Sequence, residues 1–383
     1  MTRVLLRASA AVLLLLASAL IGWRVLGPAE RLDTSSAPYP PLVVSAPGVQ
    51  GRIGVAPLIF NDRLRIYAAK HQLRADEPVY GRAVYTSRWS LRRWPQQLSG
   101  VVTSGTTVVS RWSDGLLVGQ DGRTGKILWR TSGPDAPDYA GHRTGAAAVW
   151  SPPGLRIAAG SVVVTQGQDL FGYDVSTGAE RWRATPPAGC VDGFTTAGGV
   201  YVCATGAYDA TSGRPMANWP AGPFTALGCL VAGSNCAGFR DAAGHGWLAA
   251  AATPRRAAAL DSPDATVAAG VVVSVVNGVV TGHDPDGAVR WTWPGEARVL
   301  GGSSSLVLLV RPDHHLITLE AATGRQTADV RLAFGKEDDL WKFGGYQIAE
   351  HYLAIERRRL DGPDDPESPI YYYTTDTVLL AGF

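Results

Sequence analysis

The chain has 383 residues, of which 46% are hydrophobic and 18% are charged, with 35 Lys and Arg against 33 Asp and Glu. The resulting net charge of +2 excludes the strongly basic character with which proteins attract nucleic acids or anionic lipids. About 330 residues follow the N-terminal segments, which is too many for one β-sandwich.

An apolar run opens the chain. Residues 8–23 are almost entirely apolar and have Arg on both sides. A helix of this length reaches about 24 Å, and flanking Arg side chains extend it towards the roughly 30 Å of a hydrocarbon core. A cleaved signal peptide is the alternative. Because cleavage after Ala19 would leave an apolar terminus, we expect residues 1–27 to be a retained signal anchor that spans the membrane once.

A Pro- and Ser-rich stretch follows. Residues 35–41 contain three Pro and two Ser, a composition typical of an extended linker. We therefore expect a tether over residues 28–50 and a globular part over residues 51–383.

Two segments of twelve residues share one pattern. Residues 118–129 and 171–182 each contain Asp, then Thr-Gly three and four positions later, then Trp four positions further. The apolar run before each Asp predicts a half-buried strand. The Asp can accept backbone N–H groups in a turn that Gly closes at positive φ. The Trp on the next strand is suited to packing between neighbouring sheets.

Weaker copies of the pattern recur at spacings of about 35 residues, and a double spacing near residues 236–260 indicates a degenerate unit. Units of about 35–45 residues with four short strands are typical of β-propellers, because one blade cannot bury both its faces alone. A Pro/Gly-rich insertion at about residues 131–156 should be an exposed loop. The repeat positions are Asp121, Gly125, Trp129, Asp174, Gly178, Trp182, Asp209, Gly213, Trp219, Asp284, Gly287, Trp291, Glu320 and Gly324.

Four cysteines lie within 47 residues. Cys190 and Cys203 flank one expected hairpin turn, and Cys229 and Cys236 flank another. Pairing Cys190 with Cys203 and Cys229 with Cys236 is one of three connectivities and the one that we expect, with four free thiols as the alternative. Two hairpin-compatible pairs favour an oxidising compartment, and hence a globular part outside the cytoplasm.

The repeat resembles that of the PQQ-like β-propeller superfamily, which reads apolar-Ala/Gly-x-Asp-x-x-Thr-Gly-x-x-x-Trp. Residues 118–129 and 171–182 match it fully, and the clear resemblance covers about residues 98–332. It implies an all-β fold, a seven- to eight-bladed β-propeller with four-stranded blades. The one N-terminal transmembrane helix expected from the apolar run would precede it. The blade number stays open because the first and last segments either form a blade each or complete one blade together. Arg outnumbers Lys 31 to 4, which is typical of a GC-rich genome and suggests an actinobacterial, membrane-anchored member.

Some members of that superfamily are dehydrogenases that bind pyrroloquinoline quinone (PQQ) with calcium under a disulfide between adjacent cysteines. The closest cysteines here are seven positions apart, and the chain contains neither a C-x-x-C-H haem motif nor a G-x-S-x-G nucleophile motif. The seven histidines are scattered, and we expect the acidic residues at 336–339 and 361–367 to be solvated turns. Residues 357–359, all Arg, are expected on an edge strand. We therefore expect no catalytic residue, no cofactor and no metal.

These features favour a non-catalytic, extracytoplasmic propeller ectodomain that acts as a protein- or ligand-binding scaffold at the cell envelope. We expect attachment to the cytoplasmic membrane through the N-terminal helix, an envelope protein as partner, and no nucleic acid. The alternatives are a PQQ-dependent quinoprotein dehydrogenase-like enzyme and an ectodomain that senses a small molecule or a glycan.

Overall fold

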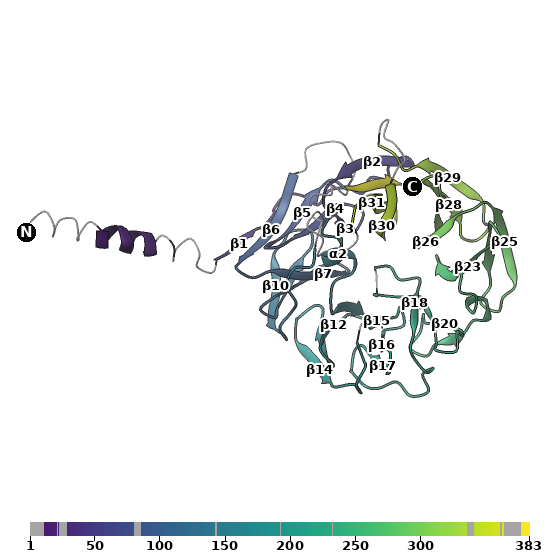
Figure 1. Ribbon diagram of the computed structural model, residues 1–383, viewed down its shortest axis with the longest axis horizontal. Coiled ribbons are helices and arrows are strands. Elements are labelled where there is room, and N and C mark those ends of the chain that lie inside the picture. The colour runs from purple at the N-terminus through teal and green to yellow at the C-terminus, as the bar shows by residue number, and fades with distance from the viewer. Residues whose placement is uncertain are drawn as a thin grey trace, which may run out of the picture.

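Eight β-sheets surround a central channel (Figure 1). The computed structural model describes residues 11–20, 22, 29–79, 86–141, 144–191, 193–231, 233–334, 341–360, 362–363 and 377–383. Within these residues the fold is the predicted all-β propeller, and the blade number left open between seven and eight is eight. Apart from helical residues 11–20 and 22, the described helices are α2 (Ala146–Trp150) and the single 3₁₀ turn η1 (Ala258–Leu260).

Each blade begins at the channel and runs outwards as an antiparallel meander (Figure 1). The first blade contains, from the channel outwards, β3 (Pro57–Phe60), β4 (Leu64–Ala69), β5 (Gln72–Glu77) and β6 (Thr86–Trp94). The second and third blades are β7 (Leu98–Ser104), β8 (Thr107–Trp112), β9 (Leu116–Asp121), β10 (Ile127–Ser132), and β11 (Leu155–Ala158), β12 (Ser161–Gln166), β13 (Asp169–Asp174), β14 (Glu180–Ala184).

The fourth blade has three described strands, and a single bridge between Tyr208 and Pro215 continues its sheet outwards. Its strands are β15 (Phe194–Thr195), β16 (Val200–Cys203) and β17 (Gly206–Asp209). The fifth blade, β18 (Thr225–Leu227), β19 (Gly238–Arg240), β20 (Gly246–Leu248) and β21 (Arg255–Arg256), occupies the place predicted for the degenerate unit. The sixth and seventh blades are β22 (Ala265–Ala268), β23 (Val271–Val276), β24 (Val279–His283), β25 (Val289–Pro294), and β26 (Arg298–Gly302), β27 (Leu306–Val310), β28 (His315–Glu320), β29 (Gln326–Arg331).

The eighth blade joins the two ends of the described propeller. Its inner strands are β30 (Trp341–Ile348), β31 (Tyr352–Arg359) and β32 (Thr377–Gly382), and its outer strand is β2 (Gly48–Ile53). Pairing of β2 with β32 closes the ring with backbone hydrogen bonds. The count is eight because residues 57–94 form a blade of their own while β2 completes the last one.

The structure differs from the predicted tether, residues 28–50, at both ends of that range. At one end β1 (Ala29–Asp33) pairs with β6 and adds a fifth strand to the outside of the first blade. At the other end β2 begins at Gly48. Composition indicated a linker, but both segments find unpaired N–H and C=O groups on strand edges, which any extended chain can satisfy.

The repeat tryptophans pack between neighbouring blades. Trp129 on β10 lies against Gly119 of its own blade and Gly178 of the next, where a Cβ atom would stand 2.1 Å and 2.3 Å from its indole ring. Its Nε1 donates a hydrogen bond of 3.0 Å to the carbonyl of Val175, also in the next blade. Trp182 and Trp291 make the same kind of bond to the following blade. Each such Trp therefore connects two blades.

A further copy of this contact occurs where the sequence showed none. Trp89 on β6 donates to the carbonyl of Gly122 in the second blade at 2.8 Å, and it faces Ala75 across the first blade. Additional residues between β5 and β6 separate the strand pair, so the regular spacing is lost. Trp219, by contrast, stacks on Phe239 of the fifth blade, with ring centroids 5.5 Å apart.

The repeat aspartates hold their turns. Asp174 Oδ1 accepts hydrogen bonds of 2.8 Å from the N–H groups of Ser176 and Thr177, and the Gly178 N–H closes the turn on the Asp174 carbonyl. Hydrogen bonding from the Ser176 hydroxyl and these N–H groups holds the pKa of Asp174 well below its usual range. Equivalent turns are closed by the N–H of Gly125 on Asp121, Gly213 on Asp209, Gly287 on Asp284 and Gly324 on Glu320.

These turns share one face of the ring with the turns between the first and second strands of the blades. The N–H of Gly122 bonds to the carbonyl of Thr106, and the N–H of Val175 bonds to that of Gly160. We call this the aspartate-turn face.

The predicted transmembrane helix, within residues 1–27, lies largely outside the described residues. Helical residues 11–20 extend away from the ring (Figure 1). No helix in the described ranges combines the length and the apolar character that a membrane crossing requires.

Candidate functional site

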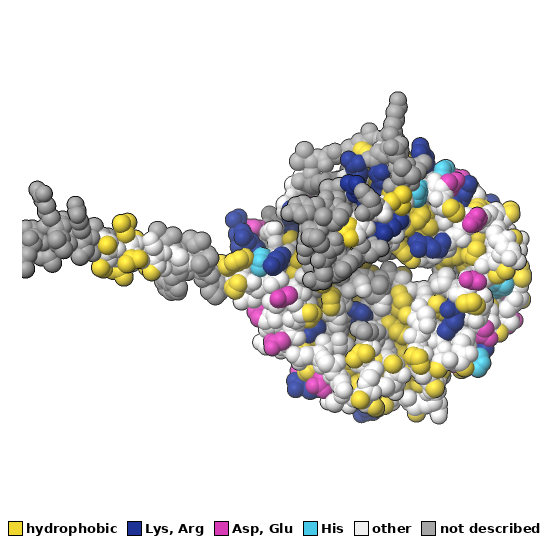
Figure 2. All heavy atoms as spheres, viewed as in Figure 1, with side chains coloured by type: hydrophobic (Ala, Val, Ile, Leu, Met, Phe, Trp, Pro, Cys, Tyr) yellow, Lys and Arg dark blue, Asp and Glu magenta, His cyan; other side chains and the backbone are white. Residues whose placement is uncertain are grey.

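Three cavities of the described surface lie in or beside the central channel. Figure 2 shows an opening at the centre of the ring, with hydrophobic side chains among those that border it. The innermost strands form its wall, and two loop segments enter it. These two segments divide the channel into separate cavities, and residues of both segments line two of these cavities.

The first segment contains α2. The prediction of an exposed loop over residues 131–156 is wrong here, because Ala148, Val149 and Trp150 are buried. Trp150 Nε1 donates a 2.8 Å hydrogen bond to the carbonyl of Pro57, and α2 packs against the innermost strands β3, β7 and β30. A Pro/Gly-rich composition is typical of exposed loops, but burying the apolar side chains of this segment is favourable enough to hold it inside the ring.

A buried carboxylate fixes this segment to the eighth blade. Glu356 on β31 is 4% exposed, and its Oε1 accepts a hydrogen bond from the Thr144 hydroxyl just before α2. Its Oε2 accepts from the N–H of Gly345 at 2.8 Å. Strand β30 has a register shift at this point, where a side chain on Gly344 would collide with Glu356.

Both predicted disulfides are present. Cys190 pairs with Cys203 and Cys229 pairs with Cys236, which confirms the local connectivity expected from the hairpin turns. The first disulfide lies in the fourth blade. The second closes the loop between β18 and β19, which is the second segment that enters the channel.

This disulfide-closed loop is attached to the fourth blade. The N–H of Thr195 on β15 donates to the carbonyl of Gly233 at 2.9 Å, and the N–H of Cys236 donates back to the carbonyl of Thr195 at 2.8 Å. Leu230, in the same loop, is 60% exposed although it borders the channel cavities. The backbone bonds and the disulfide keep this apolar side chain in the channel.

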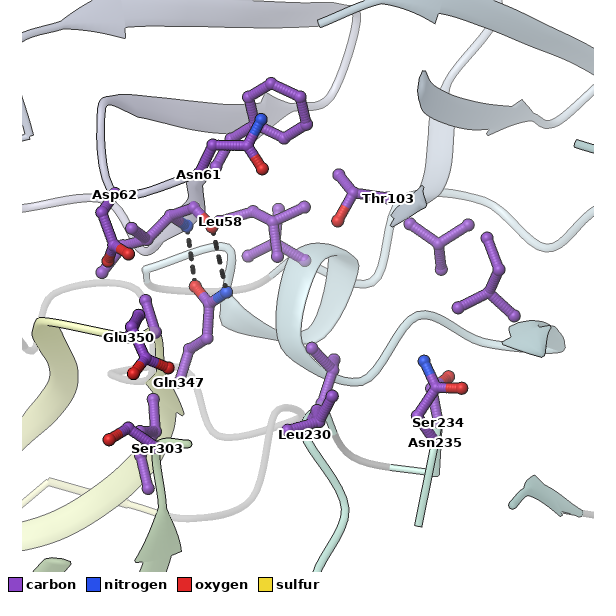
Figure 3. A pocket seen from close by; sticks show the side chains of 18 of the residues that line it. Leu58, Asn61, Asp62, Thr103, Leu230, Ser234, Asn235, Ser303, Gln347 and Glu350 are labelled. Carbon is purple, nitrogen blue, oxygen red and sulfur yellow. Dashed lines mark hydrogen bonds between the residues drawn. The ribbon is translucent and has the colours of Figure 1, made fainter. Parts of the chain in front are cut away.

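A cavity of about 520 Å³ opens on the aspartate-turn face. We call it the turn-face cavity. Its mouth includes turn residues Asn61, Asp62 and Glu350, and Figure 3 shows these side chains together with Thr103, Gln347 and Leu230 around it. Its apolar lining includes Leu58, Phe60, Val101, Val149, Ile157 and Ile348.

Gln347 joins the eighth blade to the first at this cavity. Its Oε1 accepts from the N–H of Ile59 at 2.7 Å, and its Nε2 donates to the carbonyl of Ile59 at 3.3 Å (Figure 3). The side-chain amide thus pairs with β3 as a peptide group of another strand would. Because Gln347 is 6% exposed, these bonds are largely shielded from water.

Two carboxylates lie at the mouth of the turn-face cavity. Asp62 accepts from the His351 N–H at 3.2 Å, and its other oxygen lies 3.4 Å from His351 Nδ1. Glu350 accepts from the N–H of Ser304 at 3.0 Å and from its hydroxyl. The described residues that line this cavity include no Lys or Arg. The mouth therefore carries negative charge above an apolar floor.

The opposite face has a second cavity of about 570 Å³, and one of about 370 Å³ lies between the loop and the sixth to eighth blades. Trp150, Glu356 and Arg358 line the larger one. Tyr346 borders both, and its hydroxyl donates to the carbonyl of Leu300 at 2.6 Å. Burial raises the pKa of this hydroxyl.

The histidines occupy separate places. His71 bonds to the carbonyl of Gln96 at 2.8 Å, His283 contacts Ser274, and His314 stacks on Trp341 with ring centroids 4.0 Å apart. Within the described ranges, no three His, Cys, Asp or Glu residues are grouped so that they could hold a metal ion. The acidic residues at 336–339 and 361–367, and His142, lie outside the described residues.

The prediction that residues 357–359 lie on an edge strand is wrong. They belong to β31, which pairs with β30 on one side and β32 on the other. The charge of these residues suggested an edge strand. They are tolerated on an inner strand because β31 ends at Arg359 on the rim of the ring, where long side chains can reach solvent.

Sequence reasoning did not find the residues of the turn-face cavity. Asp62, Leu230, Gln347 and Glu350 belong to no motif and come from three separate blades. The one available signal was the pair of cysteines on either side of Leu230, which indicated a fixed loop.

A family model described as outer membrane protein assembly factor BamB matches residues 23–192 and 113–216, which together span more than half of the chain. The crystal structure of BamB from Moraxella catarrhalis is similar at 14% identity, over 87% of this chain and 100% of that one, with a TM-score of 0.43. The computationally designed protein Ika8 is 13% identical over 89% of this chain and 99% of that one, with a TM-score of 0.51, which is a likeness of fold alone. A europium-containing methanol dehydrogenase is 12% identical over 89% of this chain and 93% of that one, with a TM-score of 0.45. No curated protein sequence matches.

Proposed function

The chain belongs to the family described as outer membrane protein assembly factor BamB, and from this premise we propose that it is a non-catalytic, protein-binding scaffold of the cell envelope. The family match over residues 23–216 is the observation that carries the proposal. An assembly factor acts by holding other proteins, and a rigid ring that presents loops on two faces is suited to that task.

The proposed location is the extracytoplasmic side of the cytoplasmic membrane. The two disulfides support it, because disulfides persist in oxidising compartments. The apolar run at residues 8–23 would be the anchor. We expect the protein to sediment with membranes and to keep residues 1–27, which N-terminal sequencing of the membrane-bound form tests; a terminus at Leu20 would instead mean cleavage and release.

Cross-linking in the native envelope tests the scaffold function. The full chain, purified after cross-linking, should recover the same envelope protein in independent preparations, in near-equal amount to the chain itself. An unrelated protein carrying the same residues 1–27 is the control for capture through the anchor. If no protein is enriched over this control, the scaffold proposal fails.

A quinone-dependent oxidoreductase is the alternative function, and the larger cavity on the opposite face is the place where its cofactor would have to bind. The residues that line that cavity include Glu356, Arg358 and Cys229. Calcium takes six to eight oxygen ligands, whereas Glu356 is the one carboxylate among the described residues that line it, and Thr144 and Gly345 already bond to it. The described residues therefore do not fit a calcium-held quinone.

Reconstitution tests this second candidate directly. The purified chain is incubated with PQQ and calcium and assayed for dye-linked oxidation of alcohols and sugars. We expect no turnover above that of the cofactor alone. Calcium-dependent turnover that Glu356→Gln abolishes would favour the enzyme over the scaffold.

A further inference from the structure

Leu230 presents an apolar side chain that the protein does not cover. It is 60% exposed, and the Cys229–Cys236 disulfide with the bonds to Thr195 prevents the loop from turning it away. A single exposed Leu is ordinary on a protein surface. Leu230 differs because it continues the apolar lining of the turn-face cavity, which includes Leu58 and Ile348.

The wall of the same cavity contains hydrogen-bonding groups without partners. Ser234 is 4% exposed, and its hydroxyl has no hydrogen-bond partner among the described residues. The same holds for the buried hydroxyl of Ser303. Buried polar groups are normally paired. Both residues line the cavity, and rotation about the Cα–Cβ bond would turn each hydroxyl towards a ligand that carries donors or acceptors beside its apolar part.

The charge at the mouth selects among ligands with that chemistry. Asp62 and Glu350 face the opening, and the described residues that line the cavity include no Lys or Arg to neutralise them. His351 Nδ1 lies 3.4 Å from Asp62. An anionic lipid headgroup would meet two carboxylates. A Lys or Arg would be attracted by the same pair, most strongly at low ionic strength.

We propose that the turn-face cavity receives a polypeptide segment of the partner that places an apolar side chain against Leu230 and a neighbouring Lys or Arg at Asp62 and Glu350. This inference rests on the proposed scaffold function and names the partner's chemistry. The polypeptide backbone would supply hydrogen bonds to Ser234 and Ser303. At about 520 Å³, the cavity lies within the range of roughly 300–1,000 Å³ that ligand pockets occupy.

Selection from a phage-displayed library of random heptapeptides tests the proposal on the full chain in detergent. We expect enrichment of peptides in which Leu, Ile or Phe lies next to Lys or Arg. A selected peptide, synthesised with a fluorescent label, should bind about tenfold more weakly to Leu230→Ser by fluorescence anisotropy. Val276→Ser is the matched control, because Val276 is 51% exposed on β23 and borders none of the channel cavities.

The charge is tested by Asp62→Asn combined with Glu350→Gln, changes that keep the size of both side chains. This variant should also weaken binding, and the loss should shrink as salt is added. Recovery of no common peptide class, selection of acidic peptides, preferred binding of anionic lipid vesicles, or equal affinity of Leu230→Ser and the intact chain would each overturn the proposal. If Leu230→Ser still captures the envelope partner at full yield, this inference fails while the scaffold function stands.

Discussion

The packing of Trp129 between two glycines can be tested by replacing one of them. Gly178→Ala places a Cβ atom 2.3 Å from the Trp129 ring, at a residue with φ of +72°. Gly160→Ala is the matched control: it lies in the same blade, has φ of +70°, and has no atom within 4 Å of the added Cβ. The two substitutions share the backbone penalty and differ in what the added Cβ meets, which at Gly178 is the indole and, at 2.8 Å, the rotatable hydroxyl of Thr131.

The expected magnitudes follow from that geometry. An Ala at positive φ costs about 1–2 kcal/mol, and this applies to both variants. At Gly178 the indole must also move by about 1 Å to reach ordinary contact, and Gly119 on its other side leaves it no room. Overpacking of about 1–3 kcal/mol and loss of the hydrogen bond to Val175, about 1 kcal/mol, are added. We therefore expect Gly178→Ala to lose about 2–4 kcal/mol more free energy of unfolding than Gly160→Ala.

Urea unfolding of both variants, followed by circular dichroism, measures this difference. The same pair is then compared in a Trp129→Leu background, where the smaller side chain removes the collision and the two substitutions should cost the same. The reasoning is refuted if the variants differ by less than about 0.5 kcal/mol with Trp129 present, which is the usual error of additivity. It is also refuted if the difference persists after Trp129 is replaced.

Three further predictions concern charge, disulfides and ring closure. The pKa of Asp174 is lowered in the folded state, so this carboxylate stabilises the fold above its unfolded pKa of about 4 and loses that contribution as the pH falls below it. Asp174→Asn should therefore flatten the decline of Tm between about pH 5 and 3. Parallel Tm curves for the variant and the natural chain would contradict this. Replacing Cys229 and Cys236 by Ser should lower the free energy of unfolding by about 2 kcal/mol, and alkylation of the unfolded natural chain should label four more thiols after reduction than before; four labelled thiols without reduction would disprove the pairing. Gln347→Ala leaves the N–H and C=O of Ile59 unpaired in a buried position and should cost about 2 kcal/mol in urea unfolding, whereas an unchanged midpoint would show that the amide does not hold the first and last blades together.

Several features of the propeller follow from the sequence because they depend on neighbours in the chain. The turn at Asp174 needs an acceptor, two N–H donors and a Gly within five residues, so its pattern is visible in any copy. Cys190 and Cys203 lie on either side of the short hairpin of β15 and β16, whose register is also local. Repetition of one local unit then implies a ring, since each blade needs a neighbour on both sides.

The tertiary structure decided what depends on residues far apart. Pairing of β2 with β32 joins segments more than 300 residues apart, and the composition of residues 28–50 gave no sign of it because an edge strand depends on its partner's free backbone groups. Trp150 is buried because three inner strands leave an apolar space for it. The turn-face cavity brings Asp62, Leu230 and Glu350 together from different blades. Local rules predict turns and strands, whereas the channel and its cavities form only when distant segments meet and close the ring.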